Sequence, residues 1–140
     1  MSDAAVLLDT HVWLWLADGN DRLKNTPGYE AILKARAMSG IFISIISVWE
    51  VGMLASKGRI LARQDYRRWI ERGLSESFVR LQPMTTGIAL ESSSLPGEFH
   101  ADPADRILVA TARELDIPLI TADANILAYA NRNHVKALEV

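Results

Sequence analysis

Short apolar runs alternate with amphipathic stretches along the chain, and this alternation predicts the order of its elements. Five runs are short, rich in apolar or β-branched residues and bounded by turn residues, as expected for strands of a parallel sheet. They span residues 4–8, 41–45, 78–82, 118–121 and 135–138. Because the stretches between them have helical patterns, the sequence predicts an α/β fold. Helices would cover both faces of a parallel sheet of about five strands, joined by right-handed crossovers.

Helices are predicted for most of the remaining stretches. Their approximate ranges are 11–17, 27–38, 47–56, 64–73, 87–94, 103–115 and 124–130. Ser47 and Glu50 match a capping box, in which two side chains bond free N–H groups at a helix start. Asp102 and Pro103 are residue types preferred at the N-cap and at the first helical position. The helix from Pro103 would bury one face at helical spacing, formed by Ala104, Ile107, Leu108, Thr111, Ala112 and Leu115.

Composition narrows the class of protein. With 140 residues, 49% of them hydrophobic, the chain is expected to form a single globular domain, residues 1–140. No apolar run approaches the ~20 residues that span a bilayer, and the N-terminus lacks the basic region of a signal peptide. The lack of cysteine excludes thiolate metal sites and disulfides, and fits a cytoplasmic protein. A net charge of −2 means that any contact with nucleic acid must be local.

Four acidic residues lie close to the ends of predicted strands. Asp9 follows the first strand, Asp123 follows the fourth, and Glu50 lies in the first turn of the helix after the second. Asp105 lies in the first turn of the helix before the fourth strand, and the long loop 94–102 could carry that helix start to the same edge. Ligands of open parallel sheets bind outside the carboxyl ends of the strands. We therefore expect the four carboxylates to meet there.

Each acid also has a structural explanation, since carboxylates are favoured at helix N-termini. Together, however, they would repel one another, because a single pair at ~4 Å costs about 4 kcal/mol at an effective dielectric constant of ~20. Such a cluster must hold protons or a cation. All-oxygen ligands, with no histidine pair at metal-binding spacing, favour Mg²⁺ or Mn²⁺ over zinc. An ion of this kind suits phosphoryl chemistry.

Four segments carry a resemblance to a known family. They are Leu7-Leu8-Asp9-Thr10-His11-Val12-Trp13-Leu14-Trp15, Ser47-Val48-Trp49-Glu50-Val51, the stretch from His100-Ala101-Asp102-Pro103-Ala104-Asp105-Arg106 to Ala112, and Leu119-Ile120-Thr121-Ala122-Asp123. In order and spacing they resemble the motifs of PIN-domain ribonucleases, in particular the VapC-type toxins of type II toxin–antitoxin systems. The resemblance covers essentially the whole chain and implies a three-layer α/β/α sandwich with a five-stranded parallel sheet.

The resemblance also implies a function and a set of site residues. The expected activity is Mg²⁺- or Mn²⁺-dependent hydrolysis of RNA phosphodiester bonds, with water as the nucleophile and a 3′-hydroxyl product. Asp9 and Asp105 would be the main metal ligands, and Glu50 and Asp123 would complete the catalytic acidic pocket, directly or through water. The expected partners are the RNA substrate, a second copy in a homodimer and a cognate antitoxin. An apolar groove among the first helices and the helix after Glu50 would suit that antitoxin.

Other residues are weaker candidates for contacts with substrate or with the acids. Thr10 and Thr121 could donate hydrogen bonds to carboxylates or phosphate, or only cap the backbone. Asp102 is expected chiefly to cap its helix. The other candidates are Arg106 and His100. Residues 57–80 contain seven basic and three acidic side chains, which gives a local charge of +4. This segment could guide the RNA backbone or could be only a solvent-exposed helix face. Trp13, Trp15 and Trp49 are expected in the core or an interface.

Three other classes of protein stay open on the sequence alone. A receiver-like module also gathers acids around Mg²⁺ but needs a lysine after a late strand, where this chain has Asp123. A haloacid-dehalogenase-type phosphatase would need a second aspartate two residues after Asp9, where His11 stands. The remaining alternative is a binding protein without catalytic activity, in which the four acids only cap helices.

Overall fold

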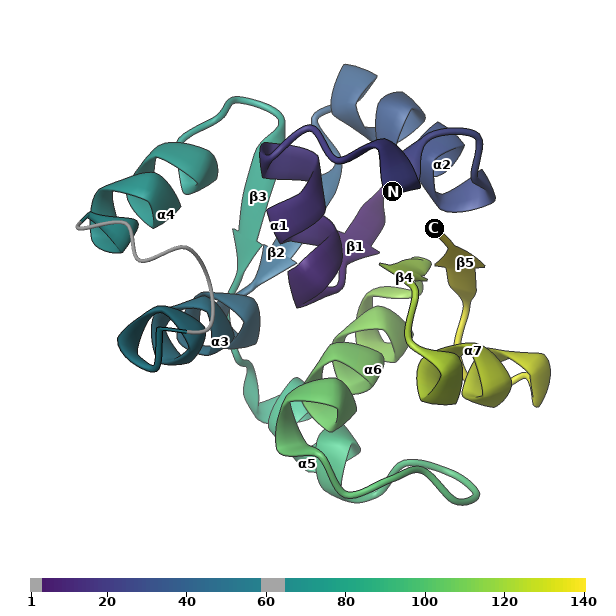
Figure 1. The fold of residues 1–140 in the computed structure, drawn as a ribbon. Coiled ribbons are helices and arrows are strands. Elements are labelled where there is room, and N and C mark those ends of the chain that lie inside the picture. Colours follow the sequence, from purple (N-terminus) through teal and green to yellow (C-terminus); the bar gives the residue numbers. More distant parts are fainter. Residues whose placement is uncertain (1–3, 59–64) are drawn as a thin grey trace.

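Five parallel strands form the centre of the protein (Figure 1), whose computed structural model describes residues 4–58 and 65–140. In the described residues the strands are β1 (Val6–Leu8), β2 (Ile41–Ser44), β3 (Val79–Gln82), β4 (Leu119–Thr121) and β5 (Ala137–Glu139), in the sheet order β3-β2-β1-β4-β5. All neighbouring strands pair in parallel. The predicted sheet is confirmed, and each strand lies within two residues of its expected bounds.

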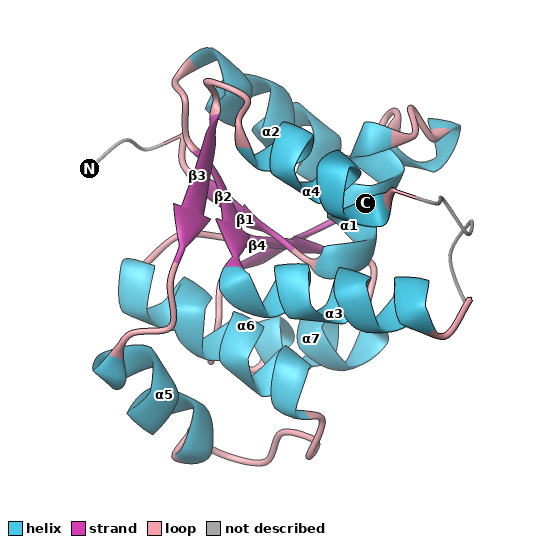
Figure 2. Ribbon diagram, turned by 90° about the vertical axis from the view of Figure 1, so that its left-hand side faces the viewer, coloured by secondary structure: helices cyan, strands magenta, loops and turns pink. Residues whose placement is uncertain are grey.

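Helices cover both faces of the sheet (Figure 2). They are α1 (Thr10–Ala17), α2 (Pro27–Ala37), α3 (Ile45–Ser56), α4 (Tyr66–Leu74), α5 (Thr86–Ser93), α6 (Pro103–Leu115) and α7 (Ala124–Asn131), with a short 3-10 helix at Asp21–Leu23. One core contains side chains of α1, α2 and α4, and the other contains those of α5, α6 and α7. Within the two described ranges, no helix is long and apolar enough to cross a membrane. The position of helices on both faces of the sheet confirms the predicted α/β/α fold class.

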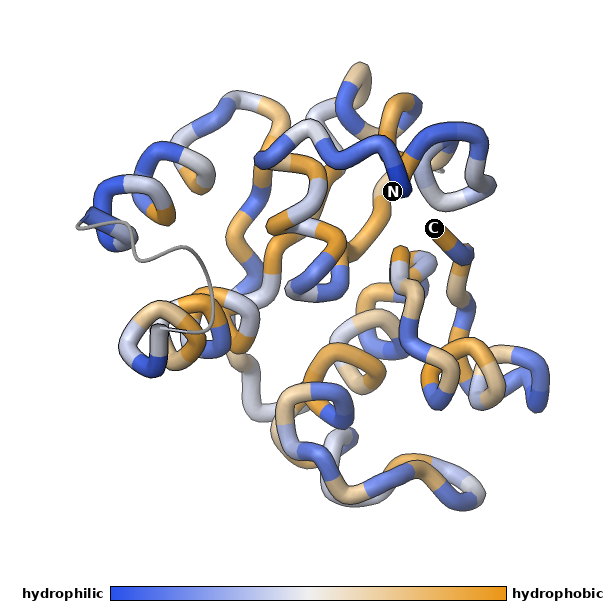
Figure 3. Tube along the Cα trace, viewed as in Figure 1, coloured by the Kyte–Doolittle hydropathy of each residue, from blue (hydrophilic) through white to orange (hydrophobic). Residues whose placement is uncertain are grey.

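The middle strand β1 separates the two cores. Successive side chains of a strand point to opposite faces of the sheet. Leu7 therefore packs in the core of α5–α7, whereas Val6 and Leu8 pack in the core of α1, α2 and α4. Burial on both faces explains why this strand is apolar at every position, and hydrophobic residues concentrate in the same central strands in Figure 3.

The start of α3 differs from the sequence prediction. The helix begins at Ile45, directly after β2, and the Ser44 side chain caps it by accepting a hydrogen bond from the Ile46 N–H at 3.1 Å. Ser47 is fully buried inside the first turn, and Glu50 lies in the second turn. The predicted capping box of Ser47 and Glu50 is therefore wrong. Because Glu50 is not needed for capping, its carboxylate requires another explanation.

Helix α6 begins and ends where the sequence predicted. The Asp102 carboxylate caps it by accepting from the backbone N–H groups of Ala104, at 2.9 Å, and Asp105, at 3.3 Å. The loop between α5 and α6 returns the chain so that α6 starts near the carboxyl ends of the strands (Figure 1). Arg106 holds this loop in place by donating to the carbonyls of Ser92, Phe99 and His100. The predicted position of Asp105 near the sheet edge follows from this arrangement.

Candidate functional site

Asp9 lies at the centre of the candidate site, where β1 ends and α1 begins. Its Oδ1 accepts from the Thr10 N–H at 2.8 Å, and its Oδ2 accepts from the Thr121 hydroxyl at 2.7 Å. The residue is only 9% exposed. This burial raises the pKa of the Asp9 carboxyl, although the hydrogen bonds from Thr121 and Thr10 oppose the rise. Both oxygens of Asp9 are therefore held in fixed directions.

Thr121 connects Asp9 to the second strand-end acid, Asp123. The Thr121 Oγ1 atom donates to Asp9 and also accepts from the Asp123 N–H at 2.9 Å. Asp123 caps α7, since its Oδ1 accepts from the N–H groups of Asn125 at 2.8 Å and Ile126 at 3.0 Å. A single buried hydroxyl thus links the two acids that follow β1 and β4, strands that already pair through their backbones.

Glu50 reaches the site from α3 through a pair of hydroxyls. The Thr10 hydroxyl donates to Glu50 Oε1 and lies 2.8 Å from the Ser47 hydroxyl, which is fully buried. Burial raises the pKa of the half-buried Glu50 carboxyl more than the Thr10 hydrogen bond lowers it, and the charge of Asp9 adds to the rise. Sequence reasoning missed the role of Ser47 because it assigned this residue to a cap.

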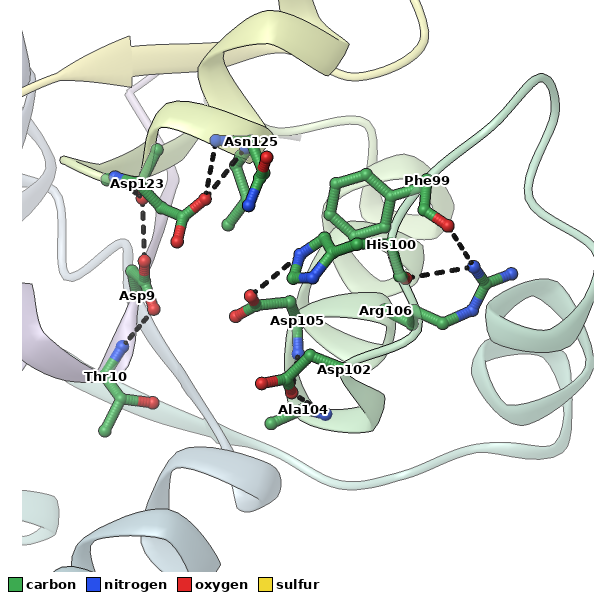
Figure 4. A network of polar contacts seen from close by, with 12 residues as sticks. Asp9, Thr10, Phe99, His100, Asp102, Ala104, Asp105, Arg106, Asp123 and Asn125 are labelled. Carbon is green, nitrogen blue, oxygen red and sulfur yellow. Dashed lines mark hydrogen bonds and ion pairs between the residues drawn. The ribbon is translucent and has the colours of Figure 1, made fainter.

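Asp105 enters the site from the first turn of α6, beside His100 (Figure 4). His100 Nε2 lies 3.0 Å from Asp105 Oδ2. Burial is the largest of the effects that raise the pKa of the Asp105 carboxyl to about 7, followed by four neighbouring carboxylates: Asp9, Asp102, Asp123 and Glu50. A pKa so far above the ordinary value means that burial and the surrounding acids disfavour the charged form of this carboxyl. The structure therefore brings together all four acids that the sequence singled out.

The arrangement suits a divalent cation. One ligand atom from each of His100, Asp105 and Asp123 can be chosen so that all three lie within 4.8 Å of one another. Asp9 and Glu50 are close enough to raise the pKa of Asp105 by their charge. In addition, His100 Nε2 is buried 3.0 Å from Asp105 Oδ2 without an aligned hydrogen bond among the described residues. A cation would offset the repulsion of the acids.

Other predicted candidates lie away from the acids or at the margin of the cluster. Asp102 is exposed and caps α6, although its charge raises the pKa of both Glu50 and Asp105. The Arg106 guanidinium donates to the carbonyl of Ser92, in the last turn of α5, and to those of the loop residues Phe99 and His100. His11 is exposed, beside the ring of Trp15.

The tryptophans and the basic segment divide between core and surface. Trp13 is buried against Trp69, as predicted, but Trp49 is 56% exposed and is not a core residue. In residues 57–80 the described basic side chains are exposed: Lys57, Arg67, Arg68, Arg72 and Arg80. Arg59 and Arg63, which were part of the predicted basic patch, lie outside the described residues. Among these side chains, Arg68 forms an ion pair with Asp65, the N-cap residue of α4.

An apolar groove of about 530 Å³ is present on the face of α1, α2 and α4. Its walls include Trp13, Tyr29, Leu33, Trp69 and Phe78. The prediction of a groove among the first helices is correct for α1 and α2. The helix that follows Glu50 in the chain is α4, and its residues Trp69 and Arg72 line the groove as expected.

The fold and the site define a class of three-layer α/β proteins with an acidic pocket at the carboxyl edge of a parallel sheet. The model of the PIN domain family matches residues 6–132. The chain belongs to the PIN domain family, and the predicted resemblance is confirmed. This membership favours the nuclease prediction over the receiver-like and phosphatase alternatives.

The relatives are similar over nearly the full length of the chain. Ribonuclease VapC22 of Mycobacterium tuberculosis is 33% identical over 124 residues, which cover 89% of this chain and 91% of that protein. Two solved structures share the fold at low sequence identity. VapBC2 from Rickettsia felis bound to a promoter DNA fragment has a TM-score of 0.70 at 14% identity and covers 96% of this chain and 98% of the other. DNA-bound VapBC from Salmonella typhimurium has a TM-score of 0.68 at 15% identity, covering 96% and 97%.

Proposed function

We propose that this protein is an endoribonuclease that hydrolyses RNA phosphodiester bonds at the acid cluster with Mg²⁺ or Mn²⁺ as cofactor. The observation that carries the proposal is the meeting of four carboxylates from four separate elements at one sheet edge: Asp9, Glu50, Asp105 and Asp123. Helix capping does not explain Glu50, and the pKa of Asp105 is raised by its neighbours. The 33% identity to Ribonuclease VapC22 supports RNA as the substrate class.

The acids divide into two proposed roles. Asp9 and Asp105 would bind the cation directly, as the family resemblance implies, and Glu50 and Asp123 would complete the site, directly or through water. When bound, the cation would neutralise the acids, stabilise charge on the phosphate and promote attack by water. The hydroxyls of Thr10 and Thr121 keep the Glu50 and Asp9 carboxylates oriented. The chain thereby supplies a rigid set of oxygen ligands.

The proposed reaction breaks the bond between phosphorus and the 3′ oxygen. Water adds its oxygen to phosphorus, and the 3′ oxygen leaves and takes up a proton, so the products are a 3′-hydroxyl and a 5′-phosphate. A hollow of about 610 Å³ beside His100 is lined by Arg106, Asn125 and Arg132 among others. We propose that the part of the RNA beside the scissile bond lies in this hollow, where the arginine side chains can contact its phosphates.

We further propose that the enzyme is the toxin of a toxin–antitoxin pair. Its similarity to Ribonuclease VapC22 and the VapBC structures supports this role. The groove of α1, α2 and α4 would receive an apolar segment of the antitoxin. Exposed side chains of Ile45, Trp49, Leu81 and Met84 supply apolar surface for a homodimer. A cytoplasmic location belongs to the same proposal.

An RNA cleavage assay tests the activity. In the presence of Mg²⁺ or Mn²⁺ the protein should cut RNA, and Asp9→Asn and Asp105→Asn should each reduce the rate at least about 100-fold, since several kcal/mol of charge stabilisation would be lost. Asp116→Asn is a matched control at the other end of α6, where the residue has a left-handed φ of 54° that asparagine tolerates. Wild-type rates in both site variants would show that the site assignment is wrong.

A further inference from the structure

The imidazole of His100 faces the acid cluster (Figure 4) with Nε2, an atom that can bind a metal ion. Its Nε2 is buried and has no hydrogen-bond partner within the described chain, although Asp105 Oδ2 is 3.0 Å away, at the distance of an ion pair. Two atoms at this distance can form an ion pair or bind one shared cation. The side chain as a whole is 32% exposed, which leaves the ring edge accessible from the neighbouring hollow.

The position of this ring is fixed by its surroundings. It contacts Phe99 edge-on, with ring centroids 4.5 Å apart, and Phe99 packs against Tyr129 at 4.8 Å. Arg106 holds the backbone of both residues, because it donates to the carbonyls of Phe99, at 3.0 Å, and His100, at 3.3 Å. Figure 4 shows the ring pointing from this braced loop toward Asp105. The imidazole is therefore preorganised, as a metal ligand should be.

We propose that His100 binds the cation of this site through Nε2, together with Asp105 and Asp123, and that this nitrogen shifts the preference of the site from Mg²⁺ toward Mn²⁺. The ligand atoms of these three residues lie within 4.8 Å of one another, which is compatible with one shared ion. Mg²⁺ strongly prefers oxygen ligands, whereas imidazole suits transition ions. The inference rests on the proposed function, because it assumes that the acid cluster holds a divalent cation.

The alternative is that His100 only offsets the charge of Asp105 and never contacts the ion. Pulsed electron paramagnetic resonance of the full chain loaded with Mn²⁺ alone separates the two. If His100 is a ligand, the spectrum of the wild type shows coupling to an imidazole nitrogen, and His100→Ala loses it. His11→Ala is the matched control, because His11 is exposed and lies next to the site without joining the cluster. This control should keep the coupling.

Calorimetric titration with Mn²⁺ and with Mg²⁺ gives the second measurement. His100→Ala should raise the Kd for Mn²⁺ at least about tenfold and the Kd for Mg²⁺ less than about threefold. His100→Gln, checked for folding by circular dichroism, should show the same selective loss. Mn²⁺ binding without nitrogen coupling in the wild type would overturn the role of His100 and leave the four-acid site intact. Failure of the wild type to bind either ion would overturn the proposed metal-dependent function as well.

Discussion

Asp105 shows how strongly single residues in this site depend on their neighbours. Its pKa of about 7 means that the folded protein, free of metal, holds a proton that the unfolded chain releases near the ordinary value of 3.8. The folded state therefore binds more protons in this window, and the free energy of unfolding must fall as the pH rises from about 4 to about 7. The raised pKa values of Asp9 and Glu50 act in the same direction.

This linkage predicts the pH dependence of stability. Without metal, urea unfolding should show a loss of stability between pH 5 and pH 7.5 that is larger in the wild type than in Asp105→Asn. The difference should be on the order of 2 kcal/mol, since each unit of pKa shift corresponds to about 1.4 kcal/mol. Asp116→Asn should follow the wild-type curve. Parallel curves for the wild type and Asp105→Asn would contradict the raised pKa.

Metal binding should reverse the same repulsion. At pH 7.5, Mg²⁺ or Mn²⁺ at about 100 times its Kd should stabilise the fold by about 2.7 kcal/mol, or roughly 5–10 °C in Tm. Asp105→Asn should reduce this increment, because one ligand and one repelling charge are lost together. Thermal melting with and without metal, or with a chelator added, measures the effect. If the wild type gained no stability, the acids would be better explained as helix caps.

Among the elements, α6 and α3 show what the sequence could and could not predict. The bounds of α6 follow from local signals, since Asp102 caps it and Pro103 starts it. The start of α3 does not follow from local signals, because Ser44 and Ser47 are both suitable caps. The choice between them depends on tertiary contacts that bury Ser47 against Thr10.

The acids were placed correctly near the sheet edge because each lies within a few residues of a strand end or helix start. The direction of His100 could not be predicted in this way. It depends on Arg106 and Phe99, which fix a loop whose path has no periodic pattern. Hydroxyl contacts between elements were also only partly foreseen. Thr10 and Thr121 were expected as donors or caps, and the structure shows both donating to carboxylates.

The Thr121 hydroxyl of β4 joins the Asp9 carboxylate to the Asp123 backbone, and its removal tests that connection. Thr121→Val should lower the free energy of unfolding by about 1–3 kcal/mol, because it leaves the buried Asp9 carboxylate and the Asp123 N–H without this partner. RNA cleavage should fall as well. Thr111→Val is the matched control, since the hydroxyl of this buried threonine donates only to the Ile107 carbonyl in its own helix. Equal effects of the two changes on stability and cleavage would argue against a positioning role for Thr121.

At the scale of the whole molecule, the groove and the acid cluster lie on different parts of the same fold. The groove is formed by α1, α2 and α4, whereas the cluster gathers residues from the ends of β1 and β4 and from α3 and α6. Helix α1 belongs to both, because Thr10 begins it beside Glu50 and Trp13 faces the groove. Mutations in the groove can therefore weaken binding of an antitoxin without changing the acid cluster, and mutations of the acids can stop cleavage without changing the groove.

Growth experiments can use this separation. Expression of the wild type should arrest bacterial growth, and co-expression of a cognate antitoxin should relieve the arrest. Leu33→Asp, which places a charge on the exposed edge of the groove, should keep the protein toxic but weaken relief, because burying the charge costs several kcal/mol. Asp105→Asn should be harmless while still binding the antitoxin. An enzyme that cleaves RNA in vitro yet leaves growth unaffected would contradict the toxin role, and undiminished relief of Leu33→Asp would place the antitoxin elsewhere.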